Sequence, residues 1–255
     1  MAATTTQAGS TRSRSVIAAA GAFACLVAGV VAIGPASDAD GARAKEIGKT
    51  GDTPKPSCPT PDSNNFPPRK ACRAYGEVTG FQVRGNGKQG LMKVPADGHI
   101  VGWAVDLSRP NKKEQKFFED VLGDRAFNGQ PSARIAFVTH SAKKKYRLRA
   151  QGPNVKLGSL LGRRQYFTLN NPIEVHKGWI AAITSKTWIP NLAHDLPGGK
   201  EKNRWRASRR SKFCDDTPQS NLTEKSHPHN KVGSTKVYGC TYDDRLLYWA
   251  YFVKS

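Results

Sequence analysis

From residue 74 onward, hydrophobic positions fall in short runs that alternate with polar ones and are separated by Gly, Pro and Asn. A period of two is typical of half-buried β-strands. The runs that we expect to be strands are 74–83, 99–107, 133–139, 145–150, 165–169, 178–185, 203–209, 236–242 and 245–253. So many short strands predict a mainly β fold, and we expect a single jelly-roll-like β-sandwich domain.

One stretch departs from the strand pattern and predicts a helix over 111–123. Asn111 followed by Glu114 makes an approximate capping box, and Gly123 is a suitable stop signal. Its apolar positions form one face and are Phe117, Phe118, Val121 and Leu122. We expect this short helix to be inserted in a connection between two strands.

The last run, "RLLYWAYFV" at 245–253, is apolar on both of its faces. A strand of this kind is expected in the centre of a sheet, covered on both sides. The alternative is that Trp249 or Tyr251 belongs to an aromatic platform for a sugar ring, since both combine an apolar body with a polar tip. Packing is also the expected role of three further candidates, Trp103, Trp179 and Trp188.

The N-terminal region contains nineteen uncharged residues from Val16 to Gly34, with Arg12 and Arg14 before them. A helix of this length spans about 29 Å, close to the roughly 30 Å hydrocarbon core of a bilayer. Positive charge is retained on the cytoplasmic side, so residues 1–15 should stay inside while the rest of the chain is exported.

The apolar segment, residues 16–36, is predicted to be either a retained single-span anchor or a cleaved signal peptide with "GPA" (34–36) as its cleavage site. The protein would then be a single-pass membrane protein or secreted. Residues 37–57 lack aromatics and predict a flexible linker. Residues 58–255 are long enough for one extracytoplasmic domain with a sizeable core.

Cysteine usage agrees with export, because an even number of cysteines in an exported chain suggests disulfides. Four lie outside the apolar segment: Cys58, Cys72, Cys214 and Cys240. They allow three pairings, and we favour Cys58–Cys72 with Cys214–Cys240, which closes the shortest loops. No C-x-x-C spacing occurs, which disfavours zinc.

Charge gives the strongest indication of function. The chain has 40 Lys+Arg against 20 Asp+Glu, and the first 57 residues hold six of the basic and four of the acidic ones, which leaves 34 against 16, or +18, for the exported domain. Strand alternation places the cations of two runs on one face of each strand. The first set is Lys143, Lys145, Arg147 and Arg149, and the second is Arg204, Arg206 and Arg210.

Each basic set has an ordinary explanation as a solvated sheet face, which keeps an exported protein soluble. The size of the net charge favours contact with a polyanion instead, because it creates a field that attracts anionic partners. Outside a cell, the available polyanions are cell-wall polymers with phosphates or uronates, and anionic lipid headgroups. Nucleic acid is disfavoured by export and by the lack of an RNP, zinc-finger or helix-turn-helix pattern.

No catalytic motif or cofactor site is recognisable in the sequence. His194 and Asp195 are neighbours, but their side chains would point apart on a strand. A glycosidase pair of Asp106 with Asp195 requires the fold to bring them together. The "HPH" at 227–229 offers two imidazoles without a third ligand, so we expect no metal site.

Four stretches are similar to an uncharacterised family of exported proteins from high-GC Gram-positive bacteria. They are "VTGFQ" (78–82), "VGWAVDLSRP" (101–110), "GSTKVYGC" (233–240) and "RLLYWAYFV" (245–253). The resemblance covers about residues 72–255 and implies a single exported domain. It implies no activity, so no catalytic residue is carried over from it.

Two classes of function therefore remain for the exported domain. The first is a binding module that contacts an anionic envelope polymer or lipid surface through its basic strand faces. The second is an enzyme acting on an envelope glycan, with a site assembled from distant residues such as Asp106, His194 and Asp195. A structural partner of another envelope protein is a further alternative.

Overall fold

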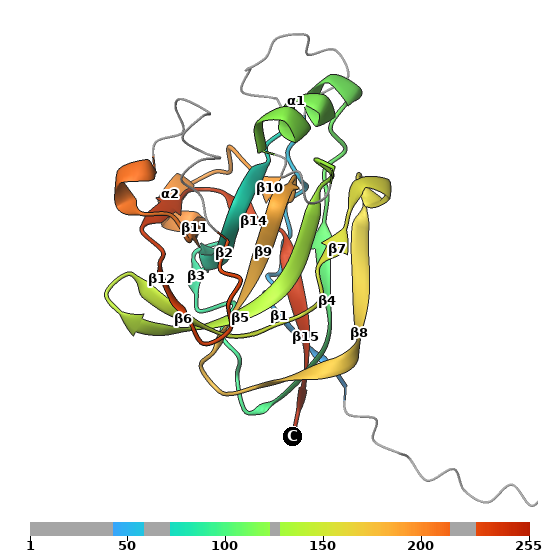
Figure 1. Ribbon diagram of the computed structural model, residues 1–255. Coiled ribbons are helices and arrows are strands. Elements are labelled where there is room, and N and C mark those ends of the chain that lie inside the picture. The colour runs from blue at the N-terminus through green and yellow to red at the C-terminus, as the bar shows by residue number, and fades with distance from the viewer. Residues whose placement is uncertain (1–42, 59–71, 123–127, 215–227) are drawn as a thin grey trace, which may run out of the picture. The chain divides into compact units, whose positions relative to one another are not determined.

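The computed structural model describes residues 43–58, 72–122, 128–214 and 228–255, all of which belong to one compact unit (Figure 1). This part of the chain is mainly β, with antiparallel strands in curled sheets and two short helices. The prediction of a mainly β domain with one inserted helix is confirmed in its main features. The second helix, α2 (Gly199–Lys202), was not predicted.

The larger sheet has nine strands. They are β2 (Tyr75–Gly85), β3 (Lys88–Gln89), β5 (Ser132–Ala142), β6 (Lys145–Gln151), β7 (Val155–Lys156), β9 (Ile180–Ile189), β11 (Arg204–Ala207), β12 (Thr235–Val237) and β13 (Cys240–Tyr242). Their order is β12-β6-β5-β9-β2-β11-β13, with β3 beside β2 and β7 beside β5. The central strands β5, β9 and β2 correspond to predicted runs.

The smaller sheet has four strands. They are β1 (Lys45–Ile47), β4 (Gly98–Asp106), β8 (Arg164–Val175) and β15 (Tyr248–Lys254), in the order β1-β15-β4-β8. A further pair joins β10 (Leu192–Ala193) to β14 (Arg245–Leu246). Two short 3₁₀ turns, η2 (Gly158–Leu160) and η3 (Ser211–Phe213), lie in connections.

The main hydrophobic core contains residues from both sheets. Ile135 and Ile183 of the nine-stranded sheet join Trp103 and Tyr248 of the four-stranded sheet in one buried cluster. Side chains of this size contribute about 1.5–3 kcal/mol each when they are fully buried. The shared core therefore explains why the two sheets form one unit.

A second cluster lies on the other face of the nine-stranded sheet. Phe81, Val138, Tyr146, Leu148 and Tyr238 belong to it. Strand β5 is consequently buried on both faces along its first half, which explains the nearly unbroken apolar run "ARIAFV" at 133–138.

The two C-terminal runs differ from the predicted strands in one respect, because each of them is divided. Residues 236–242 form parts of β12 and β13, which lie at opposite edges of the nine-stranded sheet. Residues 245–253 divide at Leu247 between β14 and β15. Strand β15 lies between β1 and β4, as expected for a central strand.

The segment predicted as a flexible linker, 37–57, differs from that expectation from residue 43 onward. Strand β1 pairs with β15, the Ile47 side chain is buried in the main core, and Ser57 donates its backbone N–H to the Leu192 carbonyl at 2.8 Å. The stretch is rich in small and charged residues, and a three-residue edge strand leaves little pattern in such a composition. Its order comes from the exposed edge of β15.

Both disulfides follow the favoured pairing. Cys58 is bonded to Cys72, and Cys214 is bonded to Cys240, with 14 and 26 residues of separation. The first bridge attaches the segment after β1 to the start of β2. The second attaches the residue after η3 to β13. Disulfides of this kind are typical of an oxidising, extracytoplasmic environment.

Helix α1 (Lys112–Leu122) begins with the predicted capping box and lies at one end of the sheets, opposite the C-terminus (Figure 1). Glu114 donates its backbone N–H to Asn111 Oδ1 at 3.0 Å, and Asn111 donates its own to Glu114 Oε2 at 2.9 Å. Phe118 and Leu122 are buried. Gly123, the predicted stop, lies outside the described residues.

The predicted anchor or signal peptide, residues 16–36, also lies outside the described residues. Of the two helices in the described part of the chain, neither has the length and apolar character needed to cross a membrane.

Candidate functional site

The cations of β6 lie on an exposed face, as strand alternation predicts. Lys145, Arg147 and Arg149 are exposed, whereas Tyr146 and Leu148 between them are buried in the second cluster. Within the described residues, none of the three cations pairs with a carboxylate. Arg147 Nε donates to the Gly233 carbonyl at 2.8 Å, and Arg149 Nε donates to Thr139 Oγ1 at 2.9 Å.

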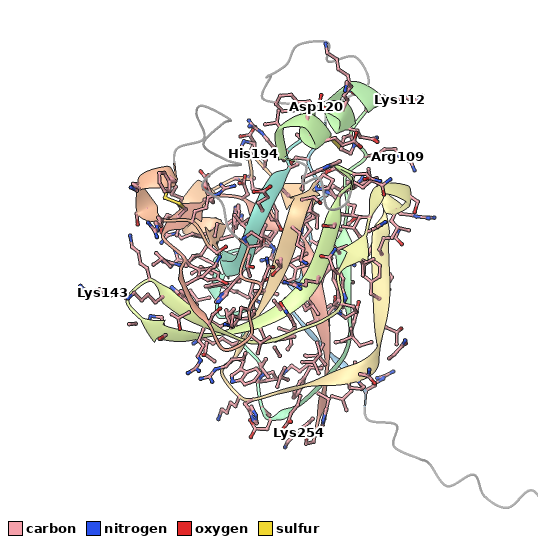
Figure 2. The ribbon with its side chains drawn as sticks, viewed as in Figure 1. Arg109, Lys112, Asp120, Lys143, His194 and Lys254 are labelled. Atoms are coloured by element: carbon pink, nitrogen blue, oxygen red, sulfur yellow. A yellow bond between two sulfur atoms is a disulfide. The ribbon has the colours of Figure 1, made fainter. Side chains whose placement is uncertain are left out.

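Lys143, the fourth cation of this set, lies at the tip of the β5–β6 hairpin (Figure 2). It has a φ of 32°, in the left-handed region that favours glycine. Its side chain is exposed, like that of the neighbouring Lys144. The hairpin tip thus extends the charged face of β6. We define the β6 basic face as Lys143, Lys145, Arg147 and Arg149.

The second predicted set is differently placed. Arg206 is half-buried and donates from Nη1 to the Tyr238 carbonyl at 2.8 Å. Arg204 pairs with Glu201 at 3.7 Å, and the same carboxylate lies 3.1 Å from Arg84 Nη1. Arg210 lies beyond β11, immediately before η3, and is exposed. The three arginines therefore do not form one row on a strand.

The two sets do not share a face of the nine-stranded sheet. Arg206 lies opposite Phe81 in the β11–β2 register, so it shares the face of the second cluster. Arg147 and Arg149 point away from that cluster. The prediction of two similar basic faces is thus replaced by one exposed face on β6, whose cations have no carboxylate partner among the described residues, and by half-buried arginines on β11.

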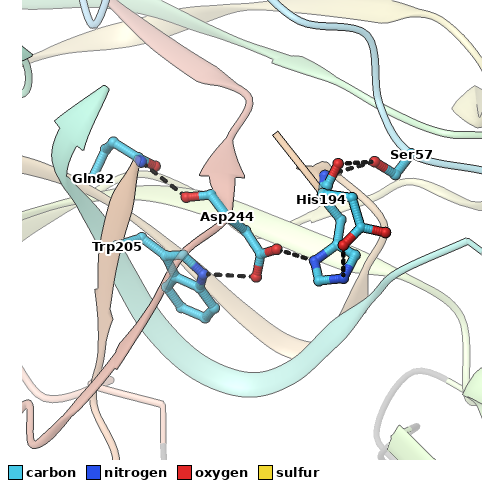
Figure 3. Close-up of polar contacts among 6 residues, drawn as sticks. Ser57, Gln82, His194, Trp205 and Asp244 are labelled. Carbon is cyan, nitrogen blue, oxygen red and sulfur yellow. Dashed lines mark hydrogen bonds and ion pairs between the residues drawn. The ribbon is translucent and has the colours of Figure 1, made fainter. Parts of the chain in front are cut away.

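A cluster of polar side chains surrounds His194, which follows β10 (Figure 3). The ring Nδ1 hydrogen-bonds to Asp244 Oδ1, and Nε2 lies 3.1 Å from Asp195 Oδ1. Asp244 also accepts a hydrogen bond from Trp205 Nε1 at 3.4 Å, and its carbonyl accepts one from Gln82 Nε2 at 3.0 Å. The cluster joins segments far apart in the sequence.

The contact between His194 and Asp195 contradicts the expectation that these two side chains point apart. That expectation assumed a continuing strand, but β10 ends at Ala193 and Asp195 has a φ of 53°. The left-handed backbone turns the Asp195 carboxylate back toward the ring. Asp244, which the sequence analysis did not identify, is 50 residues away and lies in the turn before β14. No local sequence signal connects it with His194.

The electrostatic environment favours the charged form of His194. The hydrogen bond to Asp244 raises the pKa of this imidazole, burial opposes the effect, and Asp195 adds a smaller increase. Arg73 acts in the opposite direction. An imidazolium between two carboxylates can donate a proton or fix the position of the segments that carry it.

The contacts of the two His194 ring nitrogens limit the chemistry that this cluster can perform. Both face carboxylates, so the ring is not placed to activate a hydroxyl nucleophile. Ser57 contacts the backbone of His194 and not its ring, because Ser57 Oγ accepts from the His194 N–H at 2.6 Å. Leu196 and Pro197, which follow His194 closely in the sequence, are among the residues that line an open hollow of about 410 Å³.

Asp106, the third candidate for an enzyme site, is not part of this cluster. It pairs with Arg164 at 3.3 Å, across the β4–β8 register. The Arg164 guanidinium lies 4.1 Å from the centre of the Trp249 ring. The Asp106 carboxylate is therefore engaged by Arg164, and no hydrogen bond or ion pair among the described residues joins it to His194 or Asp195.

His229 is a buried structural residue. Its backbone N–H donates to Thr79 Oγ1 at 2.9 Å, Nδ1 lies 3.1 Å from Tyr238 Oη, and Nε2 lies 3.0 Å from the Ser234 carbonyl. Burial lowers its pKa to about 4, against a smaller opposing effect of the Ser234 carbonyl. Across the described residues, no group of three or more His, Cys, Asp or Glu side chains could hold a metal ion. His227 lies outside them.

Most of the tryptophan candidates for a sugar platform are packing residues. Trp103, Trp188 and Trp249 are fully buried, and Trp179 is half-buried against the main core. Tyr251 is half-buried and stacks with Tyr166 of β8. The sequence analysis did not single out Tyr166, because the alternation of β8 does not show which exposed residue meets Tyr251.

Comparison with known proteins adds no further information on this site. No family model matches the chain, and no curated protein or solved structure matches it either. The functional argument therefore depends on the geometry of the described residues.

Proposed function

We propose that the domain is an extracytoplasmic, jelly-roll-like β-sandwich that binds an anionic envelope polymer or lipid headgroups through the β6 basic face. Its disulfides support an oxidising location. The observation that carries the proposal is that this face is exposed and that none of its cations pairs with a carboxylate of the described residues. The excess of basic residues, a net charge of +18 for the exported part, adds a long-range attraction to the local contacts.

The spacing of the cations suits an extended polyanion. Side chains on one face of a strand recur about every 6.8 Å, which is twice the strand rise. Phosphates or carboxylates along a polymer can thus meet several cations in succession. Arg147 and Arg149 are fixed by their Nε hydrogen bonds, so less side-chain entropy is lost when an anion binds.

The test is retention of the purified full chain on isolated cell wall at 0.1 and 1 M NaCl. Because counterions are released on binding, affinity should fall by up to about tenfold per contact over this range. The variant Lys145→Gln/Arg147→Gln/Arg149→Gln should bind at least about tenfold more weakly at 0.1 M. A matched control is Lys112→Gln/Lys113→Gln/Lys116→Gln on α1, which removes the same charge from another exposed surface.

The two triple variants separate a local site from a general charge effect. Equal losses in both would contradict the assignment to β6, and salt-independent retention of the native chain would exclude the electrostatic mechanism. Wall treated with hydrofluoric acid, which removes phosphate polymers, and vesicles with anionic lipid identify the source of the anion. Loss of retention on treated wall points to the polymer, and binding to vesicles points to headgroups.

A second candidate function is hydrolysis of an envelope glycan with His194 as proton donor. One arrangement favours this function. The His194 imidazole has a raised pKa and contacts two carboxylates, and two residues that follow it in the sequence, Leu196 and Pro197, line an open hollow. The test is release of reducing ends from cell-wall glycan by the native chain and by His194→Gln. Release that persists in the variant, or no release by the native chain, would reject this function.

A further inference from the structure

The outer face of the four-stranded sheet, on the side away from the main core, brings together aromatic residues from two strands. In the strand register, Tyr166 of β8 and Trp249 of β15 both lie opposite Ala104 of β4. Tyr251 of β15 lies opposite Gly102. Residues directly opposite each other share a face of a sheet. These five residues therefore share one face of the sheet, where Ala104 and Trp249 are buried and Tyr166 and Tyr251 are not.

The two tyrosine rings meet above β4. Their centroids are 6.2 Å apart and their planes differ by 29°, which is a stacked arrangement. They can approach across the intervening strand because Gly102 and Ala104 are small. A Cβ at Gly102 would come within 2.9 Å of the Phe167 carbonyl oxygen, so a larger residue does not fit there.

One ring of the stacked pair is highly exposed. Tyr166 is 64% exposed, which makes it the most exposed large hydrophobic residue in the described part of the chain. Tyr251 is half-buried beneath it. Aromatic rings gain free energy from burial, so an exposed ring beside a second aromatic ring offers an apolar surface on which a ligand can stack.

Charged groups border the rings on two sides. Arg164 lies over the Trp249 ring and pairs with Asp106 at 3.3 Å. On the other side, Glu46 of β1 lies opposite Tyr251. Burial and then the nearby Glu46 raise the pKa of Tyr251 to about 12, so its hydroxyl remains a donor at neutral pH. The rings are thus surrounded by groups that donate and accept hydrogen bonds.

We infer that this surface, composed of Tyr166, Tyr251, Arg164, Asp106 and Glu46, binds a sugar ring of a neutral glycan chain. The C–H face of a pyranose stacks on the Tyr166 ring, while the Arg164–Asp106 pair and Glu46 hydrogen-bond to its hydroxyls. Aromatic rings beside a few polar groups that fix orientation are a composition common to ligand sites.

The size of the aromatic surface favours a sugar over a protein partner. Two tyrosine rings can bury at most about 500 Å² together, whereas each side of a standard protein interface buries about 800 Å². The surrounding charges would have to be desolvated beneath a protein, but they remain hydrated at the edge of a sugar. A neutral glycan carries no charge for the β6 cations to bind, so this site goes beyond the polyanion binding proposed for β6.

The experiment measures retention of the full chain on cell-wall glycan from which phosphate polymers were removed with hydrofluoric acid, at 1 M NaCl. We expect the native chain to be retained and to be displaced by a β-1,4-linked N-acetylglucosamine hexamer. Tyr166→Ala should weaken retention at least tenfold, while Tyr166→Trp, which keeps a ring, should retain it. Val232→Ala is a matched control, because Val232 is an exposed apolar residue at another position.

Each outcome decides the matter independently of the β6 proposal. No retention of the native chain on the treated glycan, or equal retention of Tyr166→Ala, would overturn the assignment. Failure to bind polyanions would leave the assignment of the sugar site intact, because contacts between the β6 cations and polyanions are absent at high salt and on the treated glycan. If Tyr166→Ala fails to fold, as thermal unfolding would show, Tyr251→Phe and Arg164→Gln take its place, and unchanged retention in both would overturn the site.

Discussion

Strands β6 and β11 occupy corresponding places in the nine-stranded sheet but differ in what their cations do. Each is the second strand from an edge, and each is bordered by a three-residue strand from residues 235–242. On β6 the cations point away from the second cluster and are exposed. On β11, Arg206 faces that cluster and bonds to the Tyr238 carbonyl, while Arg204 pairs with Glu201.

The difference teaches that alternation identifies the polar face of a strand without showing what covers it. The arginines of β11 are half-buried and meet neighbouring segments of the chain, Arg206 at the Tyr238 carbonyl and Arg204 at Glu201 of α2. The cations of β6 are exposed, and within the described residues none of them pairs with a carboxylate. Two sets of cations with the same sequence pattern therefore differ in the fold, since one is partly buried among partners and the other is exposed.

The largest expected effect concerns the bridge that attaches the chain after η3 to β13, the neighbour of β11. Replacement of both Cys214 and Cys240 by Ser should lower the free energy of unfolding by about 3.5 kcal/mol, from the loop entropy for 26 residues of separation. Urea denaturation measures it. Retention on wall through β6 should be unchanged below the unfolding transition, and a parallel loss of binding would show that the two regions are not independent.

The second effect concerns His229, which supports the β6 side through Tyr238. The pKa of His229 is lowered to about 4 by burial, so the native state keeps this ring neutral. Its contribution is present above the unfolded pKa of about 6.5 and is lost as pH falls toward 4, by at most about 1.4 kcal/mol per pH unit. Urea unfolding at pH 7, 6, 5 and 4 tests this.

The control for the acid effect is His229→Gln, which keeps hydrogen-bonding groups and does not titrate. Its unfolding free energy should be lower at pH 7 but should fall less steeply between pH 6.5 and 4. Identical slopes for the variant and the native chain would assign the acid sensitivity to other groups.

The third prediction compares the substitution of one arginine on β11 with that of one arginine on β6. Arg206→Gln removes the hydrogen bond to Tyr238 and should reduce the free energy of unfolding by about 1 kcal/mol, with no change in retention on wall. Arg147→Gln should change stability by less than about 0.5 kcal/mol and should weaken retention several-fold at 0.1 M NaCl. The same pattern in both variants would remove the distinction between the two strands.

Much of the fold could be predicted from local signals. The capping box of Asn111 and Glu114 fixed the start of α1, and alternation in 145–150 identified which β6 side chains are buried. Strand β1 and the division at Leu247 could not be predicted, since β1 depends on a partner about 200 residues away. Short edge strands take their conformation from the pairing partner more than from their own composition.

The candidate sites were less predictable than the fold for the same reason. The contact of Asp244 with His194 and the stacking of Tyr166 with Tyr251 both join residues that are far apart in the chain. Asp195 was visible in the sequence, but its left-handed backbone was not, because aspartate adopts that conformation in only a minority of cases. Its contact with the ring therefore required the fold.

The smallest expected effect concerns the His194 cluster, which lies on the β11 side because Asp244 accepts a hydrogen bond from Trp205. The pKa of His194 is raised chiefly by Asp244, so the imidazolium stabilises the fold below the unfolded pKa of about 6.5. This contribution is lost as pH rises through the folded pKa, in the opposite direction to His229. Since the His194 side chain is 26% exposed, solvent weakens the effect.

Urea unfolding from pH 6 to 9 should show a decline in the unfolding free energy of the native chain. Asp244→Asn should largely remove this decline, and Asp195→Asn should remove a smaller part of it. Equal effects of the two substitutions would mean that the hydrogen bond on Nδ1 is not the main cause, and the cluster would then act as a general acidic environment instead of a clamp between β10 and the turn before β14.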